Sequence, residues 1–220
     1  MIGAHAVEGI YNTYTGATNI NGGILEVNGA IRGSAFTVNA GGTLAGGGDG
    51  QFTGRIGSLT LNAGGTVAPG SSPGILGTGN VTTNGGTYAF EIGGLTRGFG
   101  HDQLVTDGTI NLGASVATLK IDLISGYIPA SGDTYYLWLN DGIDPVTGEF
   151  VGLPEGALFP VTDTGWLTDP SDSWQISYVT DGDGVHRNDI ALTYIPEPSG
   201  ALLTGGVVLL ALLRRRRGVA

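Results

Sequence analysis

Three carboxylates gather in one short stretch near the C-terminal end of the chain. The segment DGDGVHRND, residues 181–189, contains Asp181, Asp183 and Asp189. Hard oxygen ligands on a loop are what Ca²⁺ binds in proteins. The EF-hand template does not fit, because Val185 stands at its fifth position and no glycine follows. We therefore interpret the stretch as a hairpin turn with solvated acids, keep calcium binding by these three aspartates as the alternative, and expect no resident metal or cofactor.

Residues that could catalyse a reaction are scattered. The histidines share no metal-ligand spacing, and His101, although followed by Asp102, has no G-x-S-x-G nucleophile motif to work with. The chain has no cysteine, which excludes disulfides, thiolate metal sites and cysteine nucleophiles. The glycine-rich first half has few acids, and they do not pair at matched repeat positions: Glu26, Asp49 and Glu91. We expect no enzyme.

The charge is strongly negative and unevenly spread. The whole chain carries a formal net charge of −10, yet four of its nine basic residues are Arg214, Arg215, Arg216 and Arg217. The part before Pro196 is therefore more acidic than the total suggests. Such a surface repels nucleic acid and anionic headgroups, so no nucleic-acid partner is expected.

Four similar segments supply the clue to the fold. They are TNINGGILEV, FTVNAGGTLAG, LTLNAGGTVAPG and VTTNGGTYAFE, and their Gly-Gly pairs begin at Gly22, Gly41, Gly64 and Gly85. A repeat of about twenty residues has the length of one coil of a β-solenoid, in which each coil buries its apolar face against the next. A glycine-rich β-meander is the alternative.

The residues after each glycine pair alternate as strand residues do. One column should stack inward as an apolar ladder, formed by Leu25, Leu44, Val67 and Tyr88. The preceding residues should face outward: Ile24, Thr43, Thr66 and Thr87. Asparagines stand just before the glycines, and we expect them to help form sharp corners through positive φ: Asn21, Asn39, Asn62 and Asn84.

Residues 9–93 resemble the autotransporter-associated β-strand repeat of bacterial surface proteins. The stretch GGTVAPGSSPGIL, Gly64 to Leu76, is the most specific part of the likeness. The resemblance implies an all-β fold whose N-terminal half is a right-handed parallel β-solenoid.

From about Gly94 the repeat fades, and residues 94–195 are similar to the segment that commonly follows such repeats. We expect them to form a β-rich cap or further coils, since an open solenoid end needs covering. Alternation predicts three half-buried strands, with one face of each formed by Leu119, Ile121 and Leu123, by Trp174, Ile176 and Tyr178, and by Ile190, Leu192 and Tyr194.

The C-terminal 25 residues have a different composition. Residues 200–213 carry no charge and, as a helix, would span about 21 Å against a hydrocarbon core of about 30 Å. Pro196 and Pro198 precede the run, and Arg214–Arg217 follow it, where they could snorkel to the headgroups. We expect a single transmembrane helix with a cytoplasmic C-terminus. A buried core helix fits less well, because the run is apolar on all sides.

This arrangement resembles the PEP-CTERM sorting signal, which occupies residues 196–220. Pro196, Glu197 and Pro198, the apolar run and the arginine cluster match its three parts in order. The resemblance implies recognition of Pro196, Glu197 and Pro198 by an exosortase, contact with membrane lipid before processing, and release to the envelope or exterior, where exopolysaccharide is a possible partner.

The N-terminal stretch MIGAHAVEGIYN has neither a basic region nor a long apolar segment, so it does not resemble a secretory signal. Export requires one, and we therefore expect a chain truncated upstream. Together these patterns predict an exported, non-catalytic structural or adhesive protein of the bacterial surface or extracellular matrix. The alternative is a β-helix protein that binds or degrades polysaccharide.

Overall fold

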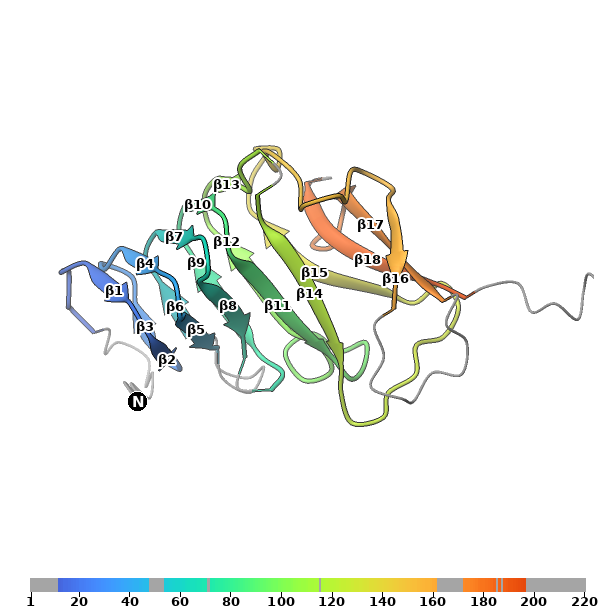
Figure 1. Cartoon of the computed structure of the whole chain (residues 1–220), viewed down its shortest axis with the longest axis horizontal. Helices are drawn as coiled ribbons and strands as arrows, with labels where there is room; N and C mark the ends of the chain where they lie inside the picture. Colours follow the sequence, from blue (N-terminus) through green and yellow to red (C-terminus); the bar gives the residue numbers. More distant parts are fainter. Residues whose placement is uncertain are drawn as a thin grey trace, which may run out of the picture.

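The computed structural model describes residues 12–47, 54–70, 72–114, 116–161, 172–184, 186 and 188–196, and over these residues the protein is all-β with no helix (Figure 1). Within that part of the chain, no helix is long and apolar enough to cross a membrane. The expected helix at 200–213 lies outside the described residues. The all-β class predicted from the repeats is confirmed.

Fifteen strands follow one another in triplets, and each triplet makes one circuit. They are β1 (Thr18–Ile20), β2 (Gly23–Glu26) and β3 (Ala30–Ile31); β4 (Phe36–Val38), β5 (Gly42–Gly46) and β6 (Gly54–Ile56); β7 (Leu59–Asn62), β8 (Thr66–Pro69) and β9 (Ile75–Thr78); β10 (Val81–Asn84), β11 (Thr87–Ile92) and β12 (Gln103–Thr106); and β13 (Ile110–Asn111), β14 (Thr118–Leu123) and β15 (Thr134–Asn140).

Strands from successive circuits pair in parallel. The first sheet has the order β1-β4-β7-β10-β13, the second β14-β11-β8-β5-β2, and the third contains β15-β12-β9-β6-β3. The circuits therefore stack along the long axis of the molecule, as Figure 1 shows from β1 to β14. This arrangement is compatible with the predicted parallel β-solenoid, and it continues past residue 93 through β15.

The apolar ladder predicted from the glycine pairs is confirmed. Leu25 pairs with Leu44, Leu44 with Val67, and Val67 with Tyr88, so the column is in register across four coils. The side chains of Leu44, Val67 and Tyr88 are fully buried, and Leu25 packs against the core. Ile24, in the outward column, is 76% exposed. Stacking thus buries a continuous face that a single coil could not bury.

The asparagines do not play the role predicted for them. Positive φ falls on the glycines, including Gly41, Gly64 and Gly85, and on none of the four asparagines. Their side chains instead bond across coils, since each Nδ2 donates to the preceding Oδ1, from Asn39 to Asn21 at 2.7 Å, Asn62 to Asn39 at 2.8 Å and Asn84 to Asn62 at 3.0 Å. Glycine adopts the left-handed conformation without the steric cost of a Cβ, which leaves the asparagine amides free to bond.

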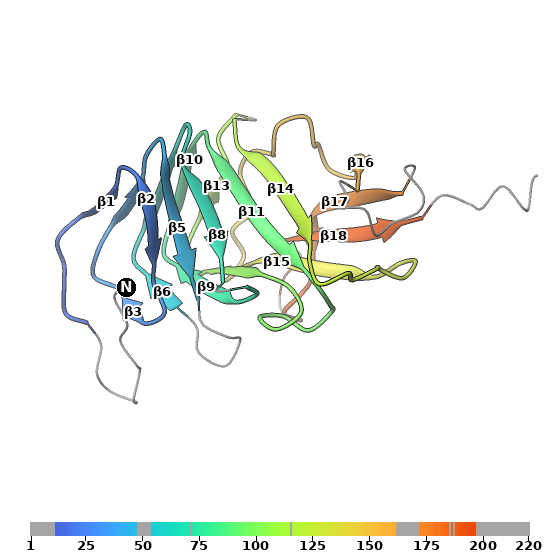
Figure 2. The same ribbon diagram turned by 60° about the horizontal axis from the view of Figure 1, so that its bottom comes forward.

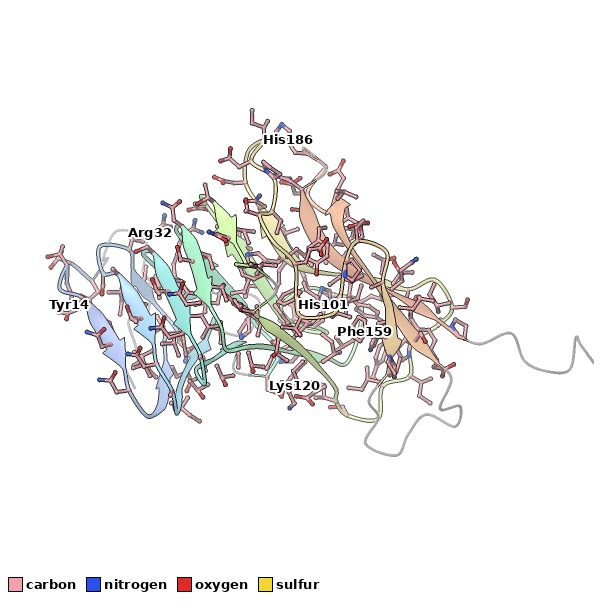
Figure 3. All side chains as sticks on the ribbon, turned by 45° about the horizontal axis from the view of Figure 1, so that its top comes forward. Tyr14, Arg32, His101, Lys120, Phe159 and His186 are labelled. Carbon is pink, nitrogen blue, oxygen red and sulfur yellow. The ribbon has the colours of Figure 1, made fainter. Side chains whose placement is uncertain are left out.

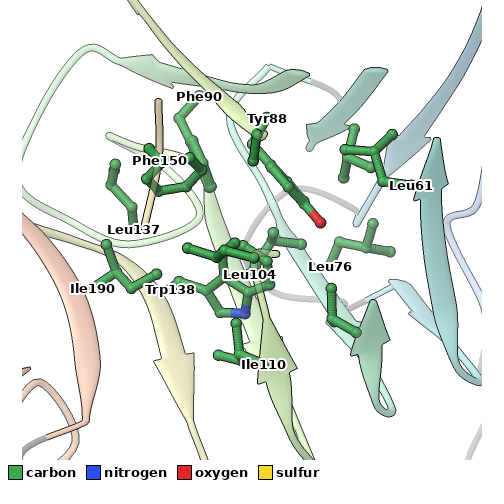
Figure 4. Packing of buried hydrophobic residues seen from close by; sticks show 14 of the residues in the cluster. Leu61, Leu76, Tyr88, Phe90, Leu104, Ile110, Leu137, Trp138, Phe150 and Ile190 are labelled. Carbon is green, nitrogen blue, oxygen red and sulfur yellow. The ribbon is translucent and has the colours of Figure 1, made fainter. Parts of the chain in front are cut away.

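Large aromatic side chains from β11, from β15 and from the segment after β15 fill the core (Figure 4). The ring of Tyr88 packs against Trp138 with centroids 4.9 Å apart and against Phe150 at 6.0 Å. The indole N–H of Trp138 donates to Oγ1 of Thr106 at 2.8 Å, so this buried donor is satisfied.

Antiparallel strands continue the third sheet after the fifth coil. β15 pairs in parallel with β12 on one side and antiparallel with β18 (Asp189–Ile195) on the other. β17 (Ser173–Thr180) then pairs antiparallel with β18, and β16 (Leu158–Pro160) with β17, as Figure 2 shows beyond β15. The apolar faces predicted for the last two strands are buried: Trp174, Ile176, Tyr178, Ile190, Leu192 and Tyr194. On β14, Ile121 and Leu123 are also buried, and Leu119 is partly buried.

Candidate functional site

The residues predicted to direct sorting lie at the limit of the structure. Pro196 is the last described residue and directly follows β18. Glu197, Pro198, the apolar run 200–213 and Arg214–Arg217 lie outside the described residues. The sorting signal therefore stays a prediction from the sequence.

A groove of about 400 Å³ lies on the outward face of the second sheet. Its floor is a column of small side chains, with Ala45 in register with Ala68 and Ala89 on the next strand. Pro69, Gly70 and Ser72 from the loop after β8 also line it, as do four acidic residues: Glu26, Glu91, Asp102 and Asp122. Methyl groups leave room above the sheet, and the carboxylates give the groove a negative field, which suits neutral or cationic ligands.

Two of these carboxylates come from adjacent strands. Glu91 on β11 is in direct register with Asp122 on β14. The sequence analysis compared Glu91 only with the other acids of the repeats, and it missed this pair because Asp122 belongs to a coil beyond the recognisable repeats. Nζ of Lys120 lies 2.6 Å from Oδ2 of Asp122 and partly compensates its charge. Exposed pairs of this kind add little stability.

Asp102 is buried at the edge of the groove and has a structural role. Its Oδ1 accepts the N–H of Gly74 at 2.9 Å, and its Oδ2 accepts the N–H of Glu91 at 2.8 Å. Burial raises its pKa to about 7, while these two backbone hydrogen bonds act in the opposite direction. Such a pKa would suit proton transfer, but both oxygens already hold the loop after β8 against β11.

His101 does not form a catalytic pair with Asp102. Its Nδ1 lies 3.1 Å from the carbonyl oxygen of Gly94, and its ring packs edge-on against Tyr135 with centroids 5.6 Å apart. Burial lowers the pKa of His101 and favours the neutral ring. The residue is part of the packing just before β12.

The aspartates of residues 181–189 are brought together by the turn between β17 and β18. Carboxylate oxygens of Asp181, Asp183 and Asp189 lie within 4.8 Å of one another. Asp181 and Asp183 are exposed, but Asp189 is fully buried, so the predicted turn of solvated acids is wrong for Asp189. Figure 3 places His186, in this turn, at the top of the view and Lys120, which pairs with Asp122 of the groove, in its lower part. The turn and the groove are therefore separate sites.

Comparisons with known proteins assign no family and no function to this chain. No family model matches the chain. No curated protein and no solved structure matches it either.

Proposed function

We propose that the protein is an exported, non-catalytic structural or adhesive component of the bacterial cell surface or extracellular matrix, sorted by an exosortase. The observation that carries this proposal is the order of three features in the last 25 residues: Pro196-Glu197-Pro198, an uncharged apolar run, and four arginines. Before processing, the run would anchor the chain in membrane lipid with the arginines in the cytoplasm, because positive charge is retained on that side.

The stacked coils support a structural role. Parallel pairing joins five circuits, and the asparagine ladder adds side-chain hydrogen bonds along the same axis. We assign this part as a right-handed parallel β-helix of autotransporter-associated repeats and β16–β18 as its cap. The cap pairs with the edge of β15, which would otherwise expose unpaired backbone groups.

Replacing Pro196, Glu197 and Pro198 by alanine tests the sorting proposal. In a cell that contains an exosortase, with a signal peptide supplied upstream of the chain, the wild type should be cut near its C-terminus and released. The triple variant should stay membrane-bound and uncut. Immunoblotting against an N-terminal tag measures the processing of each chain. Equal processing of the wild type and the triple variant would refute the proposal.

Polysaccharide binding is the alternative function, and the groove on the second sheet favours it. The floor crosses the strands, which lie about 4.8 Å apart, so an extended polymer could contact successive coils in the same way. Ala68→Trp should abolish binding by filling the groove, whereas Thr60→Trp, on the outward face of the first sheet, should not. Binding of the full chain to a glycan array tests polysaccharide binding. Release of new reducing ends tests polysaccharide cleavage, and cleavage with turnover would overturn the non-catalytic assignment.

A further inference from the structure

The turn that joins β17 to β18 holds three carboxylates at the spacing of ligands around one cation. Ca²⁺ binds oxygens at about 2.3–2.6 Å, so two of its ligands are separated by up to about 5 Å. The ligand oxygens of Asp181, Asp183 and Asp189 all lie within 4.8 Å of one another. A single ion at the centre of the group would reach all three.

Backbone hydrogen bonds fix two of these carboxylates. Oδ1 of Asp189 accepts the N–H of Asn140 at 2.8 Å, and its Oδ2 accepts the N–H of Gly182 at 2.6 Å. Oδ1 of Asp181 accepts the N–H of Gly184 at 2.7 Å. Each carboxylate oxygen has a second lone pair, so these bonds orient the acids without using up their capacity to bind a cation.

A second observation at the same place also points to a cation. The side-chain oxygens Oδ1 of Asn140 and of Asn188 are buried and have no hydrogen-bond partner, although the two residues are only 1% and 5% exposed. Both border Asp189, since Asn140 donates its backbone N–H to that carboxylate and Asn188 precedes it in the chain. Buried acceptors are almost always satisfied by protein, water or an ion.

The orientation of these two amides is determined by their nitrogens. Nδ2 of Asn140 donates to the carbonyl oxygen of Asp144 at 2.6 Å, and Nδ2 of Asn188 donates to the same oxygen at 3.0 Å. A flipped amide would set its oxygen against a carbonyl oxygen, so neither orphaned Oδ1 can exchange places with its nitrogen. The unpaired oxygens are therefore a fixed feature of the two residues that border Asp189.

Electrostatics at the turn favour a bound cation. The carboxylates of Asp181, Asp183 and Asp189 repel one another, because their oxygens lie within 4.8 Å of one another. A divalent ion among the three carboxylates would remove this repulsion.

We propose that this aspartate turn is a calcium site, in which Asp181, Asp183 and Asp189 supply carboxylate ligands and the amide oxygens of Asn140 and Asn188 complete the set of protein oxygens. Five oxygens from three segments, with water filling the rest, match the high and irregular coordination of Ca²⁺ better than the strict octahedron of Mg²⁺. The ion would tie the end of β15 to the hairpin of β17 and β18. This inference is independent of the proposed sorting and surface function.

Calorimetric titration and thermal unfolding test the site. The full chain, purified in a mild nonionic detergent and stripped with a chelator, should bind one Ca²⁺. Its unfolding midpoint should rise by about 3–6 °C at a Ca²⁺ concentration ten times Kd. Mg²⁺ at the same concentration should bind less tightly. No heat of binding and no midpoint shift at about 10 mM Ca²⁺ would overturn the proposal, as would equal affinity for Mg²⁺.

Variants separate a specific site from general attraction to an acidic protein. Asp183→Asn changes an exposed ligand and should weaken Ca²⁺ binding at least tenfold without unfolding the protein. Asp122→Asn removes one negative charge from the second sheet and should leave the affinity unchanged. Equal loss in both variants, or no loss in Asp183→Asn, would contradict the assignment.

Discussion

Oδ1 of Asn39 accepts a hydrogen bond of 2.8 Å from Nδ2 of Asn62, a residue 23 positions later and one coil further along the stack. The same geometry recurs on either side, from Asn39 to Asn21 and from Asn84 to Asn62. The amides therefore form a ladder in which every donor points toward the N-terminal coil. Asn39 and Asn62, inside the ladder, make two such bonds each, whereas Asn21 and Asn84, at its ends, make one. This difference should appear in the free energy of unfolding of the corresponding variants.

We predict that Asn62→Ala lowers the free energy of unfolding more than Asn84→Ala does. The first variant loses two ladder hydrogen bonds and the second loses one, at about 1 kcal/mol each. Urea unfolding followed by tryptophan fluorescence gives both values. Thr60→Ala, on the outward face of the same strand as Asn62, is the control and should change stability little. A smaller loss for Asn62→Ala than for Asn84→Ala would show that the ladder does not contribute.

The buried hydroxyl pair of Tyr88 and Thr83 should show energetic coupling. Their oxygens lie 2.8 Å apart in the core. Tyr88→Phe and Thr83→Val each leave one buried hydroxyl without its partner, so each should cost about 1–3 kcal/mol. The double variant should be more stable than the sum of the two losses by about 1 kcal/mol, because it leaves no orphaned group. Strict additivity in this double-mutant cycle would contradict the pairing.

Asp102 should make stability depend on pH in a direction opposite to that of a salt-bridged acid. Its folded pKa of about 7 is above its ordinary value of 3.8, because it is buried. The folded state therefore binds this proton more tightly than the unfolded state does. The resulting contribution to the free energy of unfolding is fully present below pH 4 and is lost as the pH rises through 7. Over this range the free energy of unfolding falls by at most about 1.4 kcal/mol per pH unit.

Asp102→Asn tests this dependence. The amide cannot accept both backbone N–H groups, so the variant should be less stable at every pH. The informative quantity is the slope: stability measured by urea unfolding between pH 4 and 8 should fall more steeply with pH in the wild type than in the variant. Parallel curves would show that Asp102 does not titrate in this range.

Two glycines with the same backbone conformation should respond differently to alanine. Gly148 has φ +82° and Gly132 has φ +83°, so a Cβ is strained equally in both, by about 1–2 kcal/mol. At Gly132 nothing lies within 4 Å of the added methyl group, whereas at Gly148 it would collide with the backbone oxygen of Gly113. Gly148→Ala should therefore cost about 2 kcal/mol more than Gly132→Ala in chemical unfolding. Equal losses would mean that the segment after β15 does not pack closely against the coil end.

The ladder residues show why part of the fold could be predicted. Leu25, Leu44, Val67 and Tyr88 share a position relative to the glycine pairs, and stacking requires just such a repeated position, so pattern and structure agree. Local alternation likewise placed Trp174 and Ile176 on a buried face. These features depend on strand periodicity, which can be recognised from residues that are close together in the sequence.

Other features depend on contacts between distant residues that no local pattern contains. Glu91 lies beside Asp122 because β14 pairs with β11 in the second sheet. No glycine pair precedes β14 to mark this coil in the sequence, so the pairing could not be predicted from the repeat. Asp189 became buried because β18 pairs with β15, some 50 residues earlier, and not because of anything in DGDGVHRND itself. The asparagines were assigned a backbone role from residue type alone, whereas their function is set by the coil above and below.

The antiparallel strand β18 also sets a direction for evolutionary change. It occupies the edge of β15 at which the next parallel strand of a sixth coil would have to pair. Duplication of a coil after β15 would therefore displace β16–β18 from the stack. Duplication among the earlier triplets would lengthen the molecule by one strand spacing, about 4.8 Å, and leave the closing strands unchanged. The gene can thus lengthen its product in small fixed increments, provided that the new copies arise upstream of the segment that ends the array.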